Sequence, residues 1–195
     1  MIYNKDFSKR GIADTFGRLA RIRKKLVREL RLTPEDIVLD VGCDKGDLVA
    51  YAQQHCGEAF GVDINEETIH DSNTPNLKVA DARKTDFPNE FFTKIVSSHT
   101  IEHITELPML FKEMDRILKP GGLIVLHYPW EPIRGIGTIG NAWKFLGNPF
   151  LVHKIHVNRL SHRKIGKLIK GTRLKILKKK FFFDPQPGQI TILTK

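Results

Sequence analysis

The spacing of apolar residues along the chain predicts a mixed α/β structure. Short apolar runs rich in β-branched residues recur, and between them apolar residues return every three or four positions, which is the spacing of an amphipathic helix. The clearest helical stretch covers residues 105–118. The predicted strands are 37–41, 59–63, 77–80, 94–98, 123–128, 174–177 and 189–193, and the predicted helices are 12–31, 46–55, 66–72, 105–118 and a last one that starts after Ser161 and ends at Gly171.

Strands that are apolar almost throughout and separated by helices are typical of a mostly parallel sheet covered on both faces. A chain of 195 residues suits one domain, so we expect residues 1–195 to form a single unit. The rhythm breaks at about 129–160, where glycines and prolines occur together with bulky apolar side chains. We predict that this stretch is an insert that forms a ligand site, because the preceding strand delivers it to the carboxyl edge of the sheet.

Composition excludes several classes of protein. The two cysteines, Cys43 and Cys56, have neither a disulfide framework nor the spacing of metal ligands, so we expect no metal site. The first residues lack the apolar core of a signal peptide, and no apolar run is long enough to span a membrane. These features predict a cytoplasmic protein.

Charge is distributed unevenly, and the formal net charge is +10. Residues 1–31 hold ten Lys/Arg and three Asp/Glu, residues 32–153 hold ten and eighteen, and residues 154–180 hold eleven and none. The predicted helix at 12–31 places its basic residues off the apolar stripe, a pattern typical of a helix that lies on an anionic membrane surface. RNA binding and a merely solvated basic surface remain as alternatives.

Candidate chemistry lies at the ends of the first three predicted strands. The first strand runs into Asp40-Val41-Gly42-Cys43-Asp44-Lys45-Gly46, where glycines permit a tight turn and a close approach to a ligand. Asp63 ends the second strand and can accept the protons of two ribose hydroxyls. Asp81 ends the third, beside the place of an adenine. An ordinary turn or a helix cap explains each feature alone, but together they indicate an adenosine-containing ligand.

Two further motifs complete a recognisable series. Ser97 to Ile104 reads SSHTIEHI, and Arg116 to Gly122 reads RILKPGG. With the motifs above they cover about 36–128, and the series resembles the class I S-adenosylmethionine-dependent methyltransferases, in particular the small-molecule and quinone-type branch called methyltransferase type 11. The resemblance implies a Rossmann-like, doubly wound sheet, S-adenosylmethionine as cofactor, and a small or lipid-like methyl acceptor.

The resemblance also assigns cofactor contacts. Asp40 and the backbone at Gly42 and Gly46 would hold the methionine end of the cofactor, and Asp63 would hold the ribose. The remaining assigned residues follow the third and fourth strands: Asp81 and Ala82 beside the adenine, and Ser98 and His99 facing the sulfonium and the acceptor.

Histidines supply the candidate general bases, because imidazole titrates near neutral pH. We name His99 and His103, and note that His103 can instead bond near the start of the next helix. The predicted acceptor residues are Tyr128, Trp130, His153 and His156, for which packing in the core or a loop is the alternative interpretation.

One residue departs from the pattern, since Asp44 stands where the family has its middle glycine. Its side chain can crowd a ligand or place negative charge beside it, although aspartate tolerates left-handed backbone better than most residues. Two alternatives to a small-molecule enzyme therefore stay open: an RNA methyltransferase, suggested by the basic flanks, and a non-catalytic module that binds S-adenosylmethionine. Absence of an Asn/Asp-Pro-Pro-aromatic motif disfavours nucleic-acid amino groups, and absence of a full GxGxxG loop disfavours hydride transfer.

Overall fold

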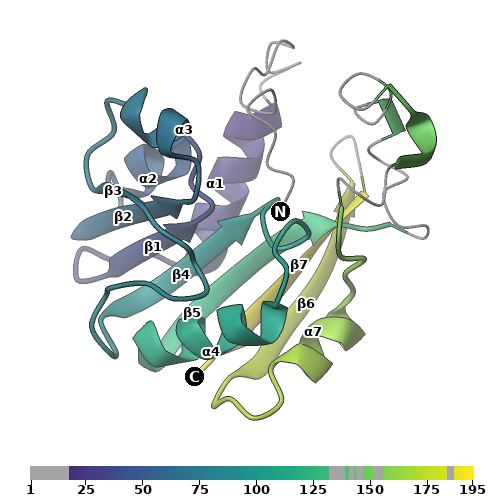
Figure 1. Ribbon diagram of the computed structural model, residues 1–195. Helices are drawn as coiled ribbons and strands as arrows, with labels where there is room; N and C mark the ends of the chain where they lie inside the picture. The colour runs from purple at the N-terminus through teal and green to yellow at the C-terminus, as the bar shows by residue number, and fades with distance from the viewer. Residues whose placement is uncertain (1–17, 132–138, 141–142, 144–146, 152–155, 184–186) are drawn as a thin grey trace.

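The computed structural model describes residues 18–131, 139–140, 143, 147–151, 156–183 and 187–195. They form helices around one sheet (Figure 1). The helices are α1 (Arg18–Leu30), α2 (Asp47–Ala52), α3 (Glu66–His70), α4 (Leu107–Ile117) and α7 (His162–Leu168), with a 3-10 turn at Pro149–Leu151; the strands are β1 (Ile37–Val41), β2 (Glu58–Asp63), β3 (Leu77–Val79), β4 (Phe92–Ser98), β5 (Leu118–Pro129), β6 (Lys175–Phe183) and β7 (Pro187–Thr194).

The seven strands lie in the order β3-β2-β1-β4-β5-β7-β6. Strands β1 to β5 are mutually parallel, whereas β7 runs antiparallel to both β5 and β6. The order in which strands are added reverses at the β1/β4 boundary: β1 to β3 step outward on one side, and β4 begins the other side. Such a boundary leaves a crevice beyond the carboxyl ends of the strands. The predicted doubly wound, mostly parallel sheet is confirmed.

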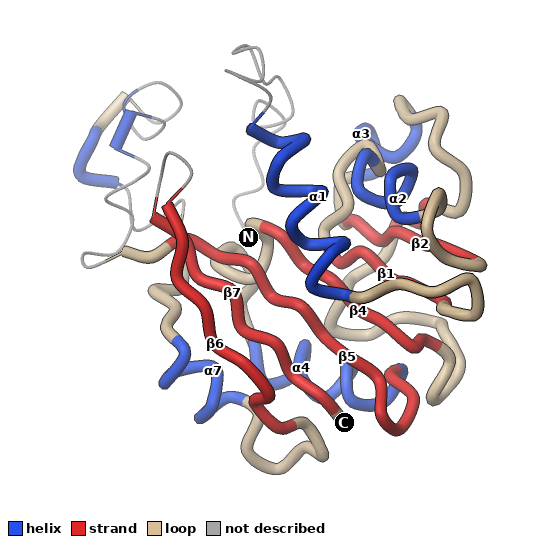
Figure 2. Tube along the Cα trace, turned by 180° about the vertical axis from the view of Figure 1, so that it is seen from behind, coloured by secondary structure: helices blue, strands red, loops and turns tan. Residues whose placement is uncertain are grey.

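Helices cover both faces, and each face has its own apolar core. Figures 1 and 2 view opposite sides of the sheet, with α4 and α7 in front in the first and α1, α2 and α3 in front in the second. On the α4 side, Phe111 and Ile165 pack against inward-facing residues of β1, β4 and β5. On the α1 side, Leu26 and Val49 do the same. The alternation of side chains along each strand supplies both cores at once.

Helix α1 uses its apolar stripe inside the protein. Ile22, Leu26, Val27 and Leu30 are all buried against the sheet. The expectation that this helix offers an apolar face to a membrane is therefore wrong for residues 18–30, since burial on the sheet removes that face from lipid. Residues 12–17 of the predicted helix lie outside the described residues.

Two strands, β5 and β6, extend furthest beyond their predicted bounds. Strand β6 continues to Phe183 because it stays paired with β7 through a run of three lysines. These lysines are not apolar, so the hydrophobic pattern did not predict this part of the strand. Lysines are common on edge strands, where they discourage pairing with other chains. Strand β5 begins at Leu118, which pairs with Phe92 of β4. From the sequence, the glycine pair that follows Leu118 predicted the end of a helix and not the inside of a strand. Within the described residues, the helices are too short and too polar for any to cross a membrane.

Candidate active site at the carboxyl edge of the sheet

The loop after β1 is built on left-handed backbone. Gly42 has φ +78°, Asp44 +51° and Gly46 +79°. A Cβ atom on Gly42 would lie 2.1 Å from Oγ1 of Thr100, so the glycine allows the β1 loop to touch the loop after β4. The sequence predicted a close approach of a ligand to the glycines of this loop. At Gly42, the group that approaches closely is the side chain of Thr100. Asp44 adopts the left-handed conformation that its side chain tolerates.

Asp63 ties this loop to the end of β2. Its Oδ2 accepts the N–H of Asp44 at 3.0 Å, and its Oδ1 accepts the N–H of Asn65 at 3.0 Å. Burial raises the pKa of Asp63, and these N–H groups only partly oppose the rise. Each carboxylate oxygen can accept more than one hydrogen bond, so the site keeps room for two hydroxyl donors.

Asp40 is a buried carboxylate with an unused oxygen. It is 4% exposed, and its Oδ1 has no hydrogen-bond partner among the described residues. Burial, followed by repulsion from Asp63 and Asp44, raises its pKa to about 8. Leaving such a polar atom unpaired is costly, so a donor or a cation is favoured here. Three acidic side chains thus meet at this corner of the sheet, and the corner becomes more negative as Asp40 ionises.

Asp81 and Ala82 follow β3. The guanidinium of Arg83 donates hydrogen bonds to both oxygens of Asp81, with Nη2 2.6 Å from Oδ2. This hydrogen bond and charge hold the pKa of Asp81 below its usual range. Ala82 is half-buried and packs on the core beside α4. A contact between Asp81 and an adenine would therefore be shared with Arg83, a partner that the sequence pattern did not reveal.

Ser98 is the last residue of β4, and His99 follows it. Oγ of Ser98 lies 2.9 Å from Nδ1 of His127, its register partner on β5. The backbone of His99 is in the left-handed region, with φ +54°. Its ring packs edge-on against the ring of His127, with the two centroids 4.4 Å apart. His127 was missed by the sequence reasoning, although its position beside Tyr128 on a strand that ends at this edge was a usable signal.

Glu102 orients His99. Its Oε1 lies 3.2 Å from Nδ1 of His99, and because an ionised carboxylate only accepts, the ring nitrogen is the donor. Burial alone would raise the pKa of Glu102, but the hydrogen bond from His99 and the nearby charges of His99, His103 and His156 hold it below its usual range. In the neutral form of His99, this hydrogen bond leaves the lone pair on Nε2. This is the arrangement of a general base held by a carboxylate.

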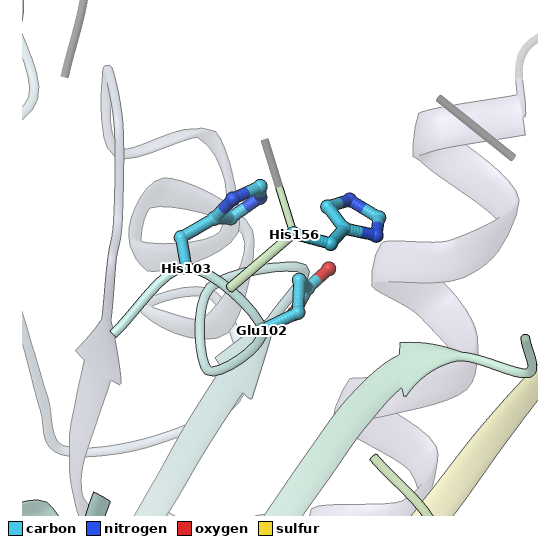
Figure 3. A group of neighbouring side chains, drawn as sticks. All are labelled: Glu102, His103 and His156. Atoms are coloured by element: carbon cyan, nitrogen blue, oxygen red, sulfur yellow. The ribbon is translucent and has the colours of Figure 1, made fainter. Parts of the chain in front are cut away.

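His103 and His156 meet beside Glu102 (Figure 3). Their ring centroids are 4.9 Å apart, and ligand atoms of the three residues all lie within 4.8 Å of one another. Nδ1 of His156 lies 2.8 Å from Oε1 of the buried Glu131. The sequence analysis predicted no metal site, and that stays a prediction. The fold nevertheless joins three possible ligands from segments about 50 residues apart, which no local spacing could reveal.

The four residues predicted to bind the acceptor lie in different surroundings. Tyr128 is a correction: it is fully buried, and its hydroxyl lies 2.7 Å from Oγ1 of Thr191 and 3.2 Å from Nδ1 of His162, so it belongs to the core. His156 joins the cluster above. Trp130 is 43% exposed. His153 lies outside the described residues.

Trp130 borders an open apolar hollow of about 280 Å³. The other lining residues come from the β6–β7 hairpin: Phe181, Phe182, Pro187 and Gly188. The insert is anchored at both ends by described residues. The N–H of Trp130 donates to the carbonyl of Pro187 at 3.0 Å, and the N–H of Asn158 donates to the carbonyl of Glu102 at 3.0 Å.

Comparison with known proteins gives one family. A family model described as a methyltransferase domain matches residues 12–179. Phosphoethanolamine N-methyltransferase 1 of Zea mays is 34% identical over 125 residues, which are 60% of this chain and 25% of the relative. The ubiquinone/menaquinone biosynthesis C-methyltransferase UbiE of Burkholderia mallei is 28% identical over 159 residues, which are 74% and 64%. The chain thus spans about a quarter of the first relative and under two thirds of the second.

Solved structures share the fold. A SAM-dependent methyltransferase from Archaeoglobus fulgidus has a TM-score of 0.69 and 21% identity, with 90% of this chain and 94% of that chain covered. Geranyl diphosphate C-methyltransferase from Streptomyces coelicolor A3(2), solved with Mg²⁺, geranyl diphosphate and S-adenosyl-L-homocysteine, has a TM-score of 0.74 and 16% identity, with 100% and 87% covered. At these identities the likeness concerns the arrangement of helices and strands.

Proposed function

The chain belongs to the methyltransferase-domain family, and on this premise we propose that it transfers the methyl group of S-adenosylmethionine to a small or lipid-like acceptor. The observation that carries the proposal is the acidic corner formed by Asp40, Asp44 and Asp63 at the carboxyl edge of the sheet. S-adenosylmethionine presents an ammonium group, a sulfonium and a ribose diol, which are the partners that such a corner favours.

The cofactor can be placed on these residues one group at a time. The ribose hydroxyls would donate to Asp63, whose oxygens retain acceptor capacity. The ammonium group would satisfy the unpaired Oδ1 of Asp40. The adenine would lie beside Asp81 and Ala82, and the sulfonium would face Ser98 and His99 at the end of β4.

The chemistry then needs alignment more than activation. A nucleophilic atom of the acceptor bonds to the methyl carbon while the carbon–sulfur bond breaks, and its electron pair remains on sulfur to give S-adenosylhomocysteine. Holding the three atoms in line supplies most of the acceleration. Where the acceptor must lose a proton, Nε2 of His99 is the base that the structure favours, because Glu102 fixes its other nitrogen as N–H. His103 faces the cluster instead.

The acceptor site that we propose is the apolar hollow beside Trp130, bounded by the start of the insert and the β6–β7 hairpin. Its lining suits a hydrocarbon or aromatic group better than a free phosphate. The relatives are named for acceptors as different as phosphoethanolamine and quinones. The proposal of a lipid-like acceptor therefore rests on the lining of this hollow.

Peripheral contact with an anionic membrane is proposed through charge and the β6 edge. Leu177 and Phe181 on β6 are each about 60% exposed, and Lys178 and Lys179 beside them are exposed. On α1, by contrast, Lys25 stacks on the ring of Phe182. Sedimentation with anionic and neutral vesicles at low salt tests this, and equal partition to both would exclude it. Tighter binding to RNA would favour the RNA methyltransferase alternative, and the cytoplasmic location stays a prediction.

Calorimetry with S-adenosylmethionine and S-adenosylhomocysteine tests the cofactor. We expect binding by the wild type and a loss of roughly 1.5–3 kcal/mol in Asp63→Ala, the scale of hydrogen bonds to charged groups. Asp86→Ala is the control, since Asp86 is exposed and forms an ion pair with Lys78 at the surface. No binding by the wild type would refute the proposal. Cofactor binding without methyl transfer to any component of a small-molecule extract would favour the alternative of a non-catalytic binding module.

A further inference from the structure

We propose that Glu102, His103 and His156 together bind one divalent transition-metal ion. Glu102 and His103 lie in the loop between β4 and α4, and His156 lies in the segment that returns after the insert (Figure 3). Their candidate ligand atoms all lie within 4.8 Å of one another. Two imidazoles and one carboxylate form the ligand set, from two parts of the chain that the fold alone brings together.

Glu102 supplies the strongest indication of a missing ligand. Its side chain is 1% exposed, and its Oε2 has no hydrogen-bond partner among the described residues. Its other oxygen is already used by His99. A buried carboxylate oxygen without a partner is expensive, and a bound cation removes this cost directly.

The second indication is the hydrogen bond behind His156. A metal-binding histidine usually donates its other ring N–H to a carboxylate, which fixes the tautomer and makes the ligating nitrogen more basic. His156 has this partner, because its Nδ1 lies 2.8 Å from Oε1 of the buried Glu131. Nε2 is then left with its lone pair. In the same way, His99 holds the oxygen of Glu102 that does not face the ion.

The ligand types select the class of metal. Imidazole with carboxylate suits Zn²⁺, Co²⁺, Fe²⁺ or Ni²⁺ rather than Mg²⁺ or Ca²⁺, which prefer sites made of oxygen atoms. Bonds of about 2.0–2.2 Å place tetrahedral ligand atoms roughly 3.5 Å apart. The candidate ligand atoms lie no more than 4.8 Å from one another, so small side-chain movements bring them to that spacing. Three protein ligands leave a coordination position open, as in catalytic rather than structural zinc sites.

Metal binding can be measured without any methyl transfer, so this proposal and the proposed function can fail separately. The full chain is freed of metal with a chelator and titrated with Co²⁺, followed by visible absorption, and with Zn²⁺, followed by calorimetry. We expect one ion per chain. Zn²⁺ should also raise the melting temperature, because a ligand that binds the folded state stabilises it.

Ligand variants should abolish this binding. His156→Ala and Glu102→Gln should each weaken it at least about 100-fold, and Glu131→Gln should weaken it about 10–100-fold, the usual effect of losing the carboxylate behind a ligand. His70→Ala is the matched control. His70 also lies beside a carboxylate, with Nε2 3.4 Å from Oε1 of Glu66, but both side chains are exposed. Among the described residues, these two do not belong to a group of three possible ligands.

Unchanged binding in His70→Ala together with loss in the ligand variants supports the site. Equal binding by the wild type and His156→Ala, or an equal loss in His70→Ala, overturns it and assigns the metal to surface histidines. If a buried water satisfies Glu102 instead, the wild type will take up no ion, which also overturns it. Should His156→Ala fail to fold, as judged by circular dichroism, the half-buried His103→Asn replaces it with the same expected loss.

Discussion

The backbone N–H of Asp44 donates to Oδ2 of Asp63 at 3.0 Å, and this contact joins the loop after β1 to the carboxyl end of β2. The donor belongs to the backbone, so the bond does not depend on the side chain at position 44. The position where the resembled family has glycine can therefore carry aspartate while the loop keeps its attachment. The side chain adds negative charge near Asp40 instead of breaking the turn.

Asp44→Gly should leave cofactor affinity within about threefold of wild type, which is roughly 0.6 kcal/mol. The hydrogen bond to Asp63 remains, and glycine accepts the φ of +51° without strain. Calorimetry with S-adenosylhomocysteine measures the effect. A large gain in affinity would mean that the aspartate side chain obstructs the ligand, as the departure from the family pattern first suggested.

Asp40 should make the free energy of unfolding depend on pH. Its pKa is about 8 in the folded protein, against 3.8 for an exposed aspartate. Between these values the unfolded chain has lost the proton and the folded chain keeps it, so stability falls as pH rises from about 4 to about 8. The slope cannot exceed about 1.4 kcal/mol per pH unit for one group. Urea unfolding at a series of pH values should show this slope, and Asp40→Asn should flatten it.

Cofactor affinity should show the opposite trend. A cationic ammonium group favours the ionised form of Asp40, so S-adenosylmethionine should bind more tightly as pH rises towards 8. Asp40→Asn should weaken binding and remove the dependence. An unchanged pH profile in the variant would separate this carboxylate from the cofactor site.

Gly42→Ala should destabilise the protein well beyond the effect of backbone strain. The added Cβ would lie 2.1 Å from Thr100, at a φ of +78°. Gly121→Ala is the matched control, because its φ is +75° and nothing lies within 4 Å of its Cβ position. We expect about 1–2 kcal/mol for the control, the cost of left-handed backbone, and at least about 2 kcal/mol more for Gly42→Ala. Equal losses in urea unfolding would show that the contact with Thr100 yields easily.

Trp130→Ala should lower turnover of the acceptor while leaving cofactor affinity unchanged. It removes an aromatic wall from the hollow without touching Asp40 or Asp63. Trp143→Ala serves as control, since Trp143 is 67% exposed and does not line the hollow. Loss of turnover in both variants would instead indicate a general effect of the insert.

The sequence was sufficient for the sheet, because buried parallel strands are apolar along their whole length. It placed Asp63 and the left-handed loop correctly, since strand ends and glycines can be read locally. It failed where the partner is remote. Tyr128 was assigned to the acceptor site although strand alternation turns it towards α7, and the meeting of His156 with Glu102 depends on how the chain returns from the insert.

The two bonds that anchor the insert, from Trp130 to Pro187 and from Asn158 to Glu102, have an evolutionary consequence. One end is held by the β6–β7 hairpin and the other by the loop between β4 and α4. Added flexible residues between fixed ends cost free energy only logarithmically, about 0.6 kcal/mol for each doubling in length. Changes within 132–155 can therefore accumulate in evolution at little cost to the fold, while the hollow lined by Trp130 and the β6–β7 hairpin keeps its geometry, as does the cofactor edge.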